Sequence, residues 1–363
     1  NKNGVIEGKF LGFYPSGQPQ IETTYRKGKI EGKANSYYEN GEIKEEANYT
    51  EGKITGDVLQ YHENGSKLAV IPHIDGKPHG VALTWFASGA LNTQKNFREG
   101  KLQGDGKNPA FLVYDEKRNL IEALDFKEGE ASGLHVLYNP NGTERYRVNY
   151  TNGKKNGKEK YFNEEGSLSG EGSYENGTPK GTHWRRHSNG ALAFQAEFDL
   201  KGVLLKPTCE YNQDGQKVRE FFTVQDRFDG PYNEWYDDGT PKLEYQYAAG
   251  QLSGTQKEYY PSGQIAVVSN YKDLVREGAH EEWYENGILA RRINFSQGLK
   301  DGQMGEWFPS GNIKIDAYFL EDHPDGIQSE WHENGQLKRR SQFTFGFKQG
   351  WQREWNERGR TFI

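Results

Sequence analysis

Polar and apolar residues alternate along most of this chain, in short runs that are bounded by glycine-containing turns. Between positions 41 and 52, for example, Ile43, Glu45, Ala47 and Tyr49 fall on one face of an extended segment, and the residues between them fall on the other. A period of two predicts a half-buried antiparallel strand with one apolar face, because a helix would repeat its apolar residues every three or four positions.

The alternation is divided by a turn that recurs fifteen times, usually as an aromatic pair, two polar residues and a glycine, as in YYENG and WFPSG. Eleven of the fourteen spacings between these turns are 24 residues, and the others are 30, 23 and 25. The turn positions are Gly17, Gly41, Gly65, Gly89, Asn119, Gly142, Gly166, Gly190, Gly215, Gly239, Gly263, Gly287, Gly311, Gly335 and Gly359. A fixed period of this length indicates a repeat array.

Two further features recur inside each repeat. The eighth residue after the turn glycine is usually aromatic and the second is usually Leu, Ile or Pro, and we expect the two to form one apolar stripe. A second turn, such as TNGK at 151–154, follows the aromatic, and a third glycine, such as Gly56, opens the next strand. We therefore predict an all-β fold, an elongated array of about fifteen 24-residue antiparallel β-hairpins in a twisted, curved sheet or solenoid of about thirty strands.

The repeat leaves no room for a separate globular domain, so we predict a single array over residues 1–363. Regular repeats are expected at 1–104, 121–200 and 231–363. Residues 105–120 form an insertion, and 201–230 form an irregular repeat that loses its third glycine to Lys206-Pro207. We expect the sheet to kink or bulge at these two segments.

Composition narrows the class of protein. With 33% hydrophobic residues the chain is too polar for a thick core, and with 13% aromatic residues it is too aromatic for disorder. A net charge of −6 without a basic face predicts no nucleic-acid partner. The single Cys209 excludes an internal disulfide framework, and no apolar run approaches the length of a membrane span.

The only methionine is Met304, so the chain as given lacks its start. This implies a processed or trimmed N-terminus, and an export signal removed before Asn1 is compatible with it. The periplasm or cell envelope and the cytoplasm therefore both remain open as locations.

The repeated unit G-x3-[EQ]-[WY]-[YFH]-x2-G-x-[IL]-x5-[YF]-x2-G resembles the MORN repeat, in the variant found in bacterial proteins of the YwqK antitoxin type, and it covers nearly the whole chain. The resemblance implies an elongated binding or scaffolding module. MORN arrays elsewhere are linked to phospholipid or membranes or to partner proteins, and YwqK-like proteins are labelled antitoxins of toxin–antitoxin or toxin–immunity pairs.

From residue 230 onward each repeat reads G-x3-E-[WY], which places six Glu-aromatic pairs in register. Adjacent residues of a strand point to opposite faces, so the glutamates and the aromatics form two rows on the two faces. Trp and Tyr anchor many interfaces, and an acidic row would attract a basic partner. The candidate partner-binding residues are Trp235, Tyr259, Trp283, Trp307 and Trp331 if the aromatic row faces outward, and Glu234, Glu258, Glu282, Glu306 and Glu330 if it does not.

A purely structural interpretation of the same rows is open as well. The aromatics could be the stack that faces the core, since a repeated position usually serves packing. The glutamates would then pair across strands with basic residues of the neighbouring strands. The expected partners are Lys242, Arg292, Lys314, Lys338 and Arg340.

Candidate chemistry is sparse. His183 and His187 share a strand face but lack a third ligand, which makes a poor zinc site. Asp105, Asp115 and Glu116 could gather a cation but lack EF-hand spacing. No phosphate loop, dinucleotide fingerprint or nucleophile elbow is present, and a single-layer sheet offers few pockets. We predict no metal, no cofactor, no small-molecule substrate and no enzymatic activity.

Three functions compete on this basis. The leading one is a bacterial antitoxin or immunity protein that binds a toxin along its sheet and blocks it, since a rigid aromatic surface presents much preorganised area. The second is a membrane-associated scaffold, although the chain lacks polybasic clusters and is slightly acidic. The third is an envelope protein that stacks carbohydrate on its Trp and Tyr residues.

Overall fold

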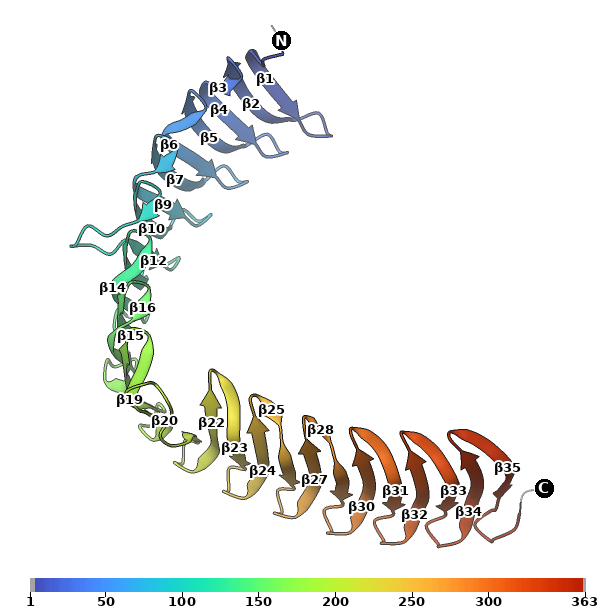
Figure 1. The fold of residues 1–363 in the computed structure, drawn as a ribbon. Helices are drawn as coiled ribbons and strands as arrows, with labels where there is room; N and C mark the ends of the chain where they lie inside the picture. Colours follow the sequence, from blue (N-terminus) through green and yellow to red (C-terminus); the bar gives the residue numbers. More distant parts are fainter. Residues whose placement is uncertain (1–3, 362–363) are drawn as a thin grey trace. The chain divides into compact units, whose positions relative to one another are not determined.

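The computed structural model describes residues 4–361, and within them the chain forms 35 strands and no helix. The strands run antiparallel to their neighbours in an open sheet, which confirms the predicted all-β hairpin repeat. The chain divides into two compact units between Gly181 and Thr182. In each unit the hairpins lie side by side (Figure 1). The organisation of residues 1–363 as a single array stays a prediction.

The strands that begin before residue 182 are β1 (Gly8–Phe13), β2 (Pro19–Arg26), β3 (Lys29–Ile30), β4 (Gly32–Tyr37), β5 (Ile43–Thr50), β6 (Lys53–Tyr61), β7 (Lys67–Ile74), β8 (Lys77–Pro78), β9 (Gly80–Trp85), β10 (Leu91–Arg98), β11 (Lys101–Leu102), β12 (Phe111–Tyr114), β13 (Leu120–Lys127), β14 (Glu130–Tyr138), β15 (Glu144–Thr151), β16 (Lys154–Lys155), β17 (Gly157–Phe162), β18 (Leu168–Glu175) and β19 (Thr178–Arg186).

The strands that begin after residue 182 are β20 (Leu192–Phe198), β21 (Thr208–Tyr211), β22 (Lys217–Val224), β23 (Arg227–Trp235), β24 (Pro241–Ala248), β25 (Gln251–Leu252), β26 (Gly254–Tyr259), β27 (Ile265–Lys272), β28 (Val275–Arg276), β29 (Gly278–Trp283), β30 (Leu289–Ser296), β31 (Leu299–Trp307), β32 (Ile313–Leu320), β33 (His323–Trp331), β34 (Leu337–Thr344) and β35 (Phe347–Glu354).

Two kinds of turn alternate along the chain. Strands β5 and β6 are joined by the two-residue turn Glu51-Gly52, in which φ is +50° and +81°. Two positive φ angles are typical of the type I′ hairpin, whose twist matches that of the strands. The longer loop after β6 closes with the N–H of Gly65 donating to the carbonyl oxygen of His62 at 2.9 Å. Gly65 has a φ of +79°, which explains why this turn repeats a glycine.

The third glycine opens a strand in some repeats, as the sequence predicted for Gly32 of β4 and Gly254 of β26, and in other repeats it forms a bulge within a longer strand. In the β5–β6 pairing, Ala47 alone stands against three residues of β6, because Asn48 pairs with Thr55 and Glu46 pairs with Leu59. Gly56, at the bulge, has a φ of +74°. In many repeats the bulge divides the second strand into two pieces, and this division raises the number of strands above the predicted thirty.

The bulge glycine also makes room for the recurrent aromatic residue. Gly254 pairs with Tyr271 and Gly302 pairs with Phe319. A glycine opposite an aromatic side chain lets the ring lie over the backbone of the neighbouring strand, a known way of stabilising a strand glycine.

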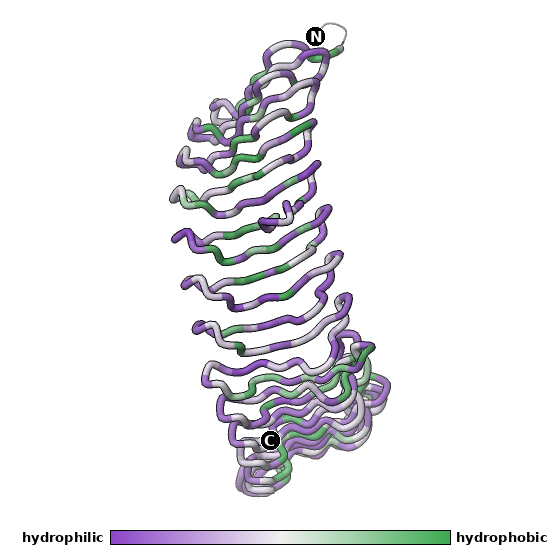
Figure 2. Tube along the Cα trace, turned by 90° about the vertical axis from the view of Figure 1, so that its left-hand side faces the viewer, coloured by the Kyte–Doolittle hydropathy of each residue, from purple (hydrophilic) through white to green (hydrophobic). Residues whose placement is uncertain are grey.

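The core is a line of mostly small side chains that crosses the middle of successive strands. Val58 pairs directly with Ile71, and the next members of the line, Ala47 and Ala82, have exposed fractions of 4% and 5%. Apolar residues recur at matching places of neighbouring strands in Figure 2. Because strands bend at bulges, one face of each hairpin curves around this line. We call it the core face and call the opposite one the stripe face.

Side chains at the two rims tie each repeat to the next. At the loop rim, the hydroxyl of Tyr38 donates to the carbonyl oxygen of Tyr61 at 2.8 Å. At the tight-turn rim, the N–H of Glu51 donates to a carboxylate oxygen of Glu31 at 2.8 Å. Equivalent bonds recur along both units, so stability depends on neighbouring repeats as expected for an array.

Each of the two irregular segments contains a loop, although β12 falls within the first segment and β21 and β22 fall within the second. The insertion forms a loop between β11 and β12, and strand pairing resumes where β12 joins β10 through Lys95 and Phe111. In the second segment, Phe198 and Leu204 form an isolated bridge before β21 begins. Leu200 is 81% exposed in this loop.

Candidate binding surface

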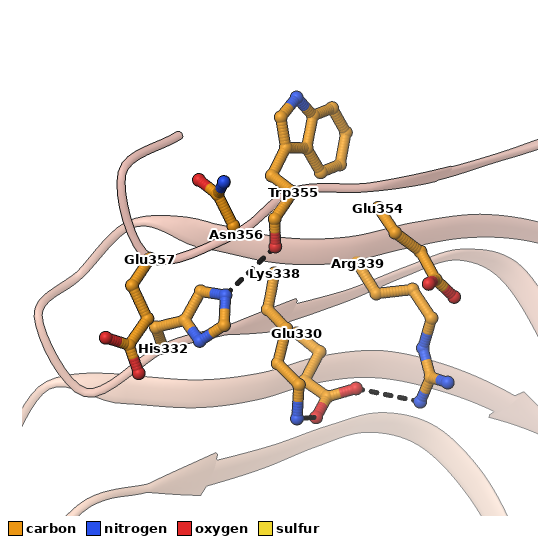
Figure 3. Close-up of a pocket in the computed structure, with 8 residues that line it drawn as sticks. All are labelled: Glu330, His332, Lys338, Arg339, Glu354, Trp355, Asn356 and Glu357. Carbon is orange, nitrogen blue, oxygen red and sulfur yellow. Dashed lines mark hydrogen bonds and ion pairs between the residues drawn. The ribbon is translucent and has the colours of Figure 1, made fainter. Parts of the chain in front are cut away.

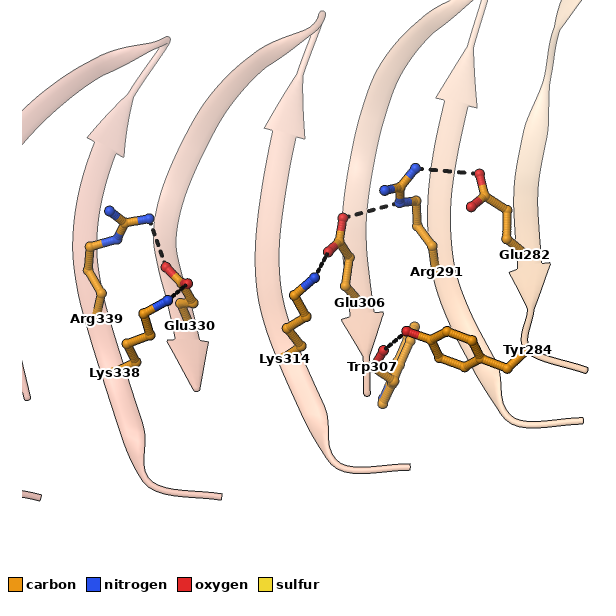
Figure 4. Close-up of polar contacts among 9 residues, drawn as sticks. All are labelled: Glu282, Tyr284, Arg291, Glu306, Trp307, Lys314, Glu330, Lys338 and Arg339. Carbon is orange, nitrogen blue, oxygen red and sulfur yellow. Dashed lines mark hydrogen bonds and ion pairs between the residues drawn. The ribbon is translucent and has the colours of Figure 1, made fainter. Parts of the chain in front are cut away.

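The candidate glutamates, which we call the Glu row, lie on the core face of the second unit. They are Glu234, Glu258, Glu282, Glu306 and Glu330. Each glutamate stands next to last in its strand, as Glu306 does in β31 and Glu330 does in β33. Their carboxylates face side chains from neighbouring strands (Figure 4). Contacts to core-face residues fix this orientation, because Glu258 accepts a hydrogen bond of 2.6 Å from the hydroxyl of Tyr245.

Two basic side chains lie against each of two members of this row, Glu306 and Glu330. Carboxylate oxygens of Glu306 lie 3.1 Å from Nε of Arg291 and 3.3 Å from Nζ of Lys314. Those of Glu330 lie 2.6 Å from Nζ of Lys338 and 2.7 Å from a guanidinium nitrogen of Arg339. The side chains of Glu306 and Glu330 are 13% and 16% exposed, so little of either carboxylate faces solvent.

The remaining members are paired as well. Glu234 lies 3.3 Å from Nζ of Lys242 and accepts a short hydrogen bond from the hydroxyl of Tyr232. Burial and then this bond raise the pKa of Tyr232 to about 12. Glu282 lies 3.0 Å from Nε2 of His280 and 3.5 Å from Arg291.

The expected cross-strand partners are therefore confirmed for Lys242, Lys314 and Lys338 and wrong for Arg292 and Arg340. Arg292 pairs with Glu281 at 2.5 Å, and its neighbour Arg291 takes the place beside the Glu row. The reason is a register shift at the start of each strand. Trp331 pairs with Leu337 but Glu330 pairs with Arg339, so Lys338 lies in a bulge. Both Lys338 and Arg339 contact Glu330, whereas the next residue points to the opposite face.

The same shift separates two apolar groups that the sequence placed in one stripe. The Leu, Ile or Pro that follows each loop lies on the stripe face, beside the Trp and Tyr residues of the aromatic row. The aromatic residue six positions later lies on the core face. Trp307 pairs with Ile313, and both line one hollow with residues of the stripe face. The expectation of a single apolar stripe is wrong here because a bulge reverses the alternation of side chains.

Aromatic and aliphatic side chains thus alternate along the stripe face of the second unit. The pairs are Trp235 with Pro241, Tyr259 with Ile265, Trp283 with Leu289, Trp307 with Ile313 and Trp331 with Leu337. We call these ten residues the aromatic stripe. All five aromatic residues are half-buried, and Ile265 is 38% exposed. The stripe is therefore partly open to solvent over successive repeats.

Side chains of the loops bond to the main-chain carbonyl groups of the stripe residues one repeat further along the chain. The hydroxyl of Tyr260 donates to the carbonyl oxygen of Trp283 at 2.7 Å, and that of Tyr284 donates to the carbonyl oxygen of Trp307 at 2.9 Å. The latter bond is drawn in Figure 4. In the last described repeats His332 serves instead, with Nε2 lying 3.0 Å from the carbonyl oxygen of Trp355.

Two of the hollows in the second unit lie beside residues of the Glu row or the aromatic stripe. One, of about 370 Å³, lies between the last two loops and holds Trp355 and His332 beside the Glu330 ion pairs (Figure 3). The other, of about 460 Å³, lies on the stripe face around Trp307. Gly305 creates space there, because a side chain at that position would collide with the Trp307 ring.

The candidate metal ligands are engaged in local structure. His183 is buried against Phe198, with ring centroids 5.0 Å apart, while Nε2 of His187 lies 2.7 Å from the carbonyl oxygen of Tyr211. The carboxylate of Asp105 accepts the N–H groups of Lys107 and Asn108, which with the Asn108 side chain lower its pKa to about 2.

Asp115 accepts two hydrogen bonds from Asn119, so it closes its own turn. Over residues 4–361 no group of three or more potential ligands is positioned to hold a metal ion. The described chain also lacks a helix long and apolar enough to cross a bilayer.

Comparison with known families finds a match over part of the chain. Six segments match the MORN repeat variant, at residues 6–27, 30–51, 155–176, 252–273, 276–297 and 324–344. The segments fall in both units. Segment 30–51 contains β4, a loop and β5, so the family's unit is centred on the loop with its glycine rather than on the tight turn. No curated protein matches the chain.

Solved structures offer only distant likeness. The crystal structure of TcdB2-TccC3-Cdc42 matches 98% of this chain at 12% identity and a TM-score of 0.17, and the chain covers 23% of that protein. A structure of the Photorhabdus luminescens Tc holotoxin pore matches 92% at 13% identity and a TM-score of 0.17, with 21% of that protein covered. The chain thus spans less than a quarter of these proteins, and at such TM-scores the likeness carries no argument.

Proposed function

We propose that this chain is a non-catalytic binding protein that holds a protein partner along the aromatic stripe, and that it acts as a bacterial antitoxin or immunity protein. The MORN repeat variant supports a binding scaffold. The antitoxin role rests on the resemblance of the repeated unit to the YwqK type. The partner is then a toxin, which the bound array blocks sterically.

The observation that carries the proposal is the stripe itself. Five aromatic and five aliphatic residues line up over consecutive strands, and Ile265 among them is 38% exposed. Apolar surface that is repeated in register and open to solvent marks an interaction site. The hydrogen bonds from Tyr260 and Tyr284 restrain the backbone of the stripe, so less conformational entropy is lost when a partner binds.

The Glu row is the weaker candidate for the same role. Its carboxylates already pair with Lys242, Arg291, Lys314, Lys338 and Arg339. A basic binding partner would have to displace these lysine and arginine side chains before it could pair with the glutamates. Replacing one ion pair by another contributes little affinity. We therefore assign recognition to Trp235, Tyr259, Trp283, Trp307 and Trp331.

A rescue experiment tests the proposal. Cells that express the toxin encoded beside this gene should survive when the full chain is co-expressed. Ile265→Asp places a charge on the stripe and should abolish protection, while the chain keeps its β-sheet circular dichroism. The matched control is Val275→Asp, at a 40% exposed position on the tight-turn rim, which should protect like the parent.

Two results would refute this function. One is full protection by Ile265→Asp at equal protein level, which would remove the stripe from the interface. The other is binding of the full chain to anionic lipid vesicles or to neutral polysaccharide with no effect on any toxin, which would favour the membrane scaffold or the envelope protein instead.

A further inference from the structure

The hollow around Trp307 differs from every neighbouring position of the stripe. Two residues before the aromatic residue, the other repeats of the stripe carry Asn233, Lys257, Glu281 and Ser329, whereas this repeat carries Gly305. The Trp307 ring lies over the Gly305 backbone in the space that a side chain would fill. The indole therefore lies close to the sheet, and it lines a cavity of about 460 Å³.

The polar groups around this hollow present mainly hydrogen-bond acceptors. Nε2 of Gln303 donates to Oδ1 of Asp316 at 3.1 Å, and Nδ2 of Asn294 donates to the carbonyl oxygen of Gln303 at 3.0 Å. Each of the two amides thus donates a hydrogen bond within the protein, and its side-chain oxygen is available to accept one from a ligand. Asp316 forms no ion pair with any residue in 4–361.

The charges that line the hollow sum to −1. Glu281 and Arg292 neutralise each other through a contact of 2.5 Å, which leaves the carboxylate of Asp316 uncompensated. A carboxylate beside an aromatic face is the arrangement that recognises an organic cation, because the cation interacts with the ring and the carboxylate together.

The array itself shows which groups its indoles accept. Nζ of Lys67 lies 5.7 Å from the ring centre of Trp85, and Nζ of Lys217 lies 5.7 Å from that of Trp235. In both cases the lysine stands two residues after the loop glycine of the same repeat. At Trp307 that position is Leu289, and no basic group of the described chain lies over the ring.

We propose that the hollow over Trp307 anchors an arginine side chain of the protein partner, with the guanidinium stacked on the indole and bonded to Asp316. This inference rests on the proposed function, and it makes the partner a protein with an exposed arginine. Arginine suits the hollow better than lysine does. Its planar guanidinium carries five donors and no acceptor, which matches a flat ring bordered by acceptors.

Indole NMR signals test the inference directly on the full chain. The chain has eight tryptophans, and Trp307→Phe assigns the signal of residue 307. The probes are three glycine-serine pentapeptides with a central arginine, lysine or citrulline. The arginine peptide should shift the Trp307 signal saturably, and the citrulline peptide, which has no charge, should bind at least about fivefold more weakly.

Matched variants separate recognition from folding. Asp316→Asn should weaken the arginine peptide about fivefold or more while the other seven indole signals stay in place. Trp85→Phe alters an indole outside the aromatic stripe whose ring already has Nζ of Lys67 5.7 Å from its centre, so it should leave binding unchanged. An equal response to citrulline, no shift of the Trp307 signal, or tighter binding of a neutral cello-oligosaccharide at this signal would overturn the inference.

The outcome is distinguishable from failure of the proposed function. If Asp316→Asn loses the arginine peptide and also lowers protection from the toxin, the anchor serves the partner. If the parent chain protects but its Trp307 signal does not shift with the arginine peptide, the arginine site is refuted and the proposed stripe interface is not. If Ile265→Asp protects fully, the interface itself is refuted whatever the peptide does.

Discussion

The hydroxyl of Tyr284 donates a hydrogen bond of 2.9 Å to the carbonyl oxygen of Trp307, one repeat further along the chain. The same bond joins Tyr38 to Tyr61 and Tyr236 to Tyr259, each at 2.8 Å. It satisfies a carbonyl group at the end of a strand, where the sheet ladder no longer supplies a donor. The tyrosine of the turn motif therefore holds two repeats together.

Removal of one such hydroxyl should have a measurable and local effect. Tyr284→Phe should lower the free energy of unfolding by about 1 kcal/mol, because the Trp307 carbonyl loses its donor. Amide exchange should speed up at the adjoining loops of residues 284–288 and 308–312 and stay unchanged in residues 4–181. The reciprocal variant Phe308→Tyr adds the hydroxyl that this repeat lacks and should stabilise the chain. Destabilisation by both variants would contradict the role given to the bond.

The recurrent aromatic residue of the core face should contribute more. Phe295 stands opposite Gly278 and carries the guanidinium of Arg276 5.4 Å from its ring centre. Since the ring is half-buried, Phe295→Ala should cost about 3 kcal/mol, the lower end of the range for buried aromatics. Hydrogen exchange should loosen around β29 to β31. A uniform change along the whole chain would disprove stabilisation by neighbouring repeats.

The bulge glycines should resist substitution for a backbone reason. Gly302 has a φ of +105°, and a Cβ there would lie 3.5 Å from the Cβ of Asn294, an ordinary contact. Space is therefore available, and the cost of Gly302→Ala comes from the positive φ, at about 1–2 kcal/mol. Thermal unfolding measures this cost. Ala290→Gly in the neighbouring β30 provides a comparison in which only strand propensity changes.

Acid should weaken the ion pairs of Glu330. Burial acts to raise the pKa of Glu330, but the ammonium of Lys338 and the guanidinium of Arg339 outweigh it and hold the pKa below its usual value. A lowered folded-state pKa contributes stability that is present above the unfolded-state value and is lost as pH falls through the folded one. The loss should begin near the ordinary glutamate range, at about pH 4.

Comparison with Glu330→Gln measures that contribution. The parent should melt at a higher temperature than this variant at pH 6, and the difference should shrink as pH falls below about 4. Glu285→Gln, in an exposed loop, should show little difference at either pH. A difference between parent and Glu330→Gln that grows on acidification would have the wrong sign for the argument.

Local patterns in the sequence were sufficient to predict the hairpins. The Glu51-Gly52 turn and the loop at Gly65 use residues whose conformational preferences operate over two or three positions. The period then fixed which hairpins neighbour one another. Lys242, Lys314 and Lys338 could be assigned to the Glu row for the same reason.

Register shifts set the limit of that prediction. Strict alternation placed Arg292 and Arg340 beside the glutamates. The register shift at Ala290 brought Arg291 there instead, and the one at Lys338 brought Arg339. A bulge adds one residue to one strand, and the residues that form it show no distinctive type here. Likewise, Tyr284 could be predicted to lie at a rim, but its carbonyl partner depends on how closely two loops approach.

The 24-residue period, which is constant from Gly215 to Gly359, has a consequence for any partner of this surface. Each repeat adds two strands, so equivalent side chains recur at about 9.6 Å, twice the spacing of hydrogen-bonded strands. A ligand that touches several repeats must carry its own complementary groups at multiples of this interval. Gain or loss of one whole repeat would therefore change the length of this surface and leave the interval between equivalent side chains unchanged.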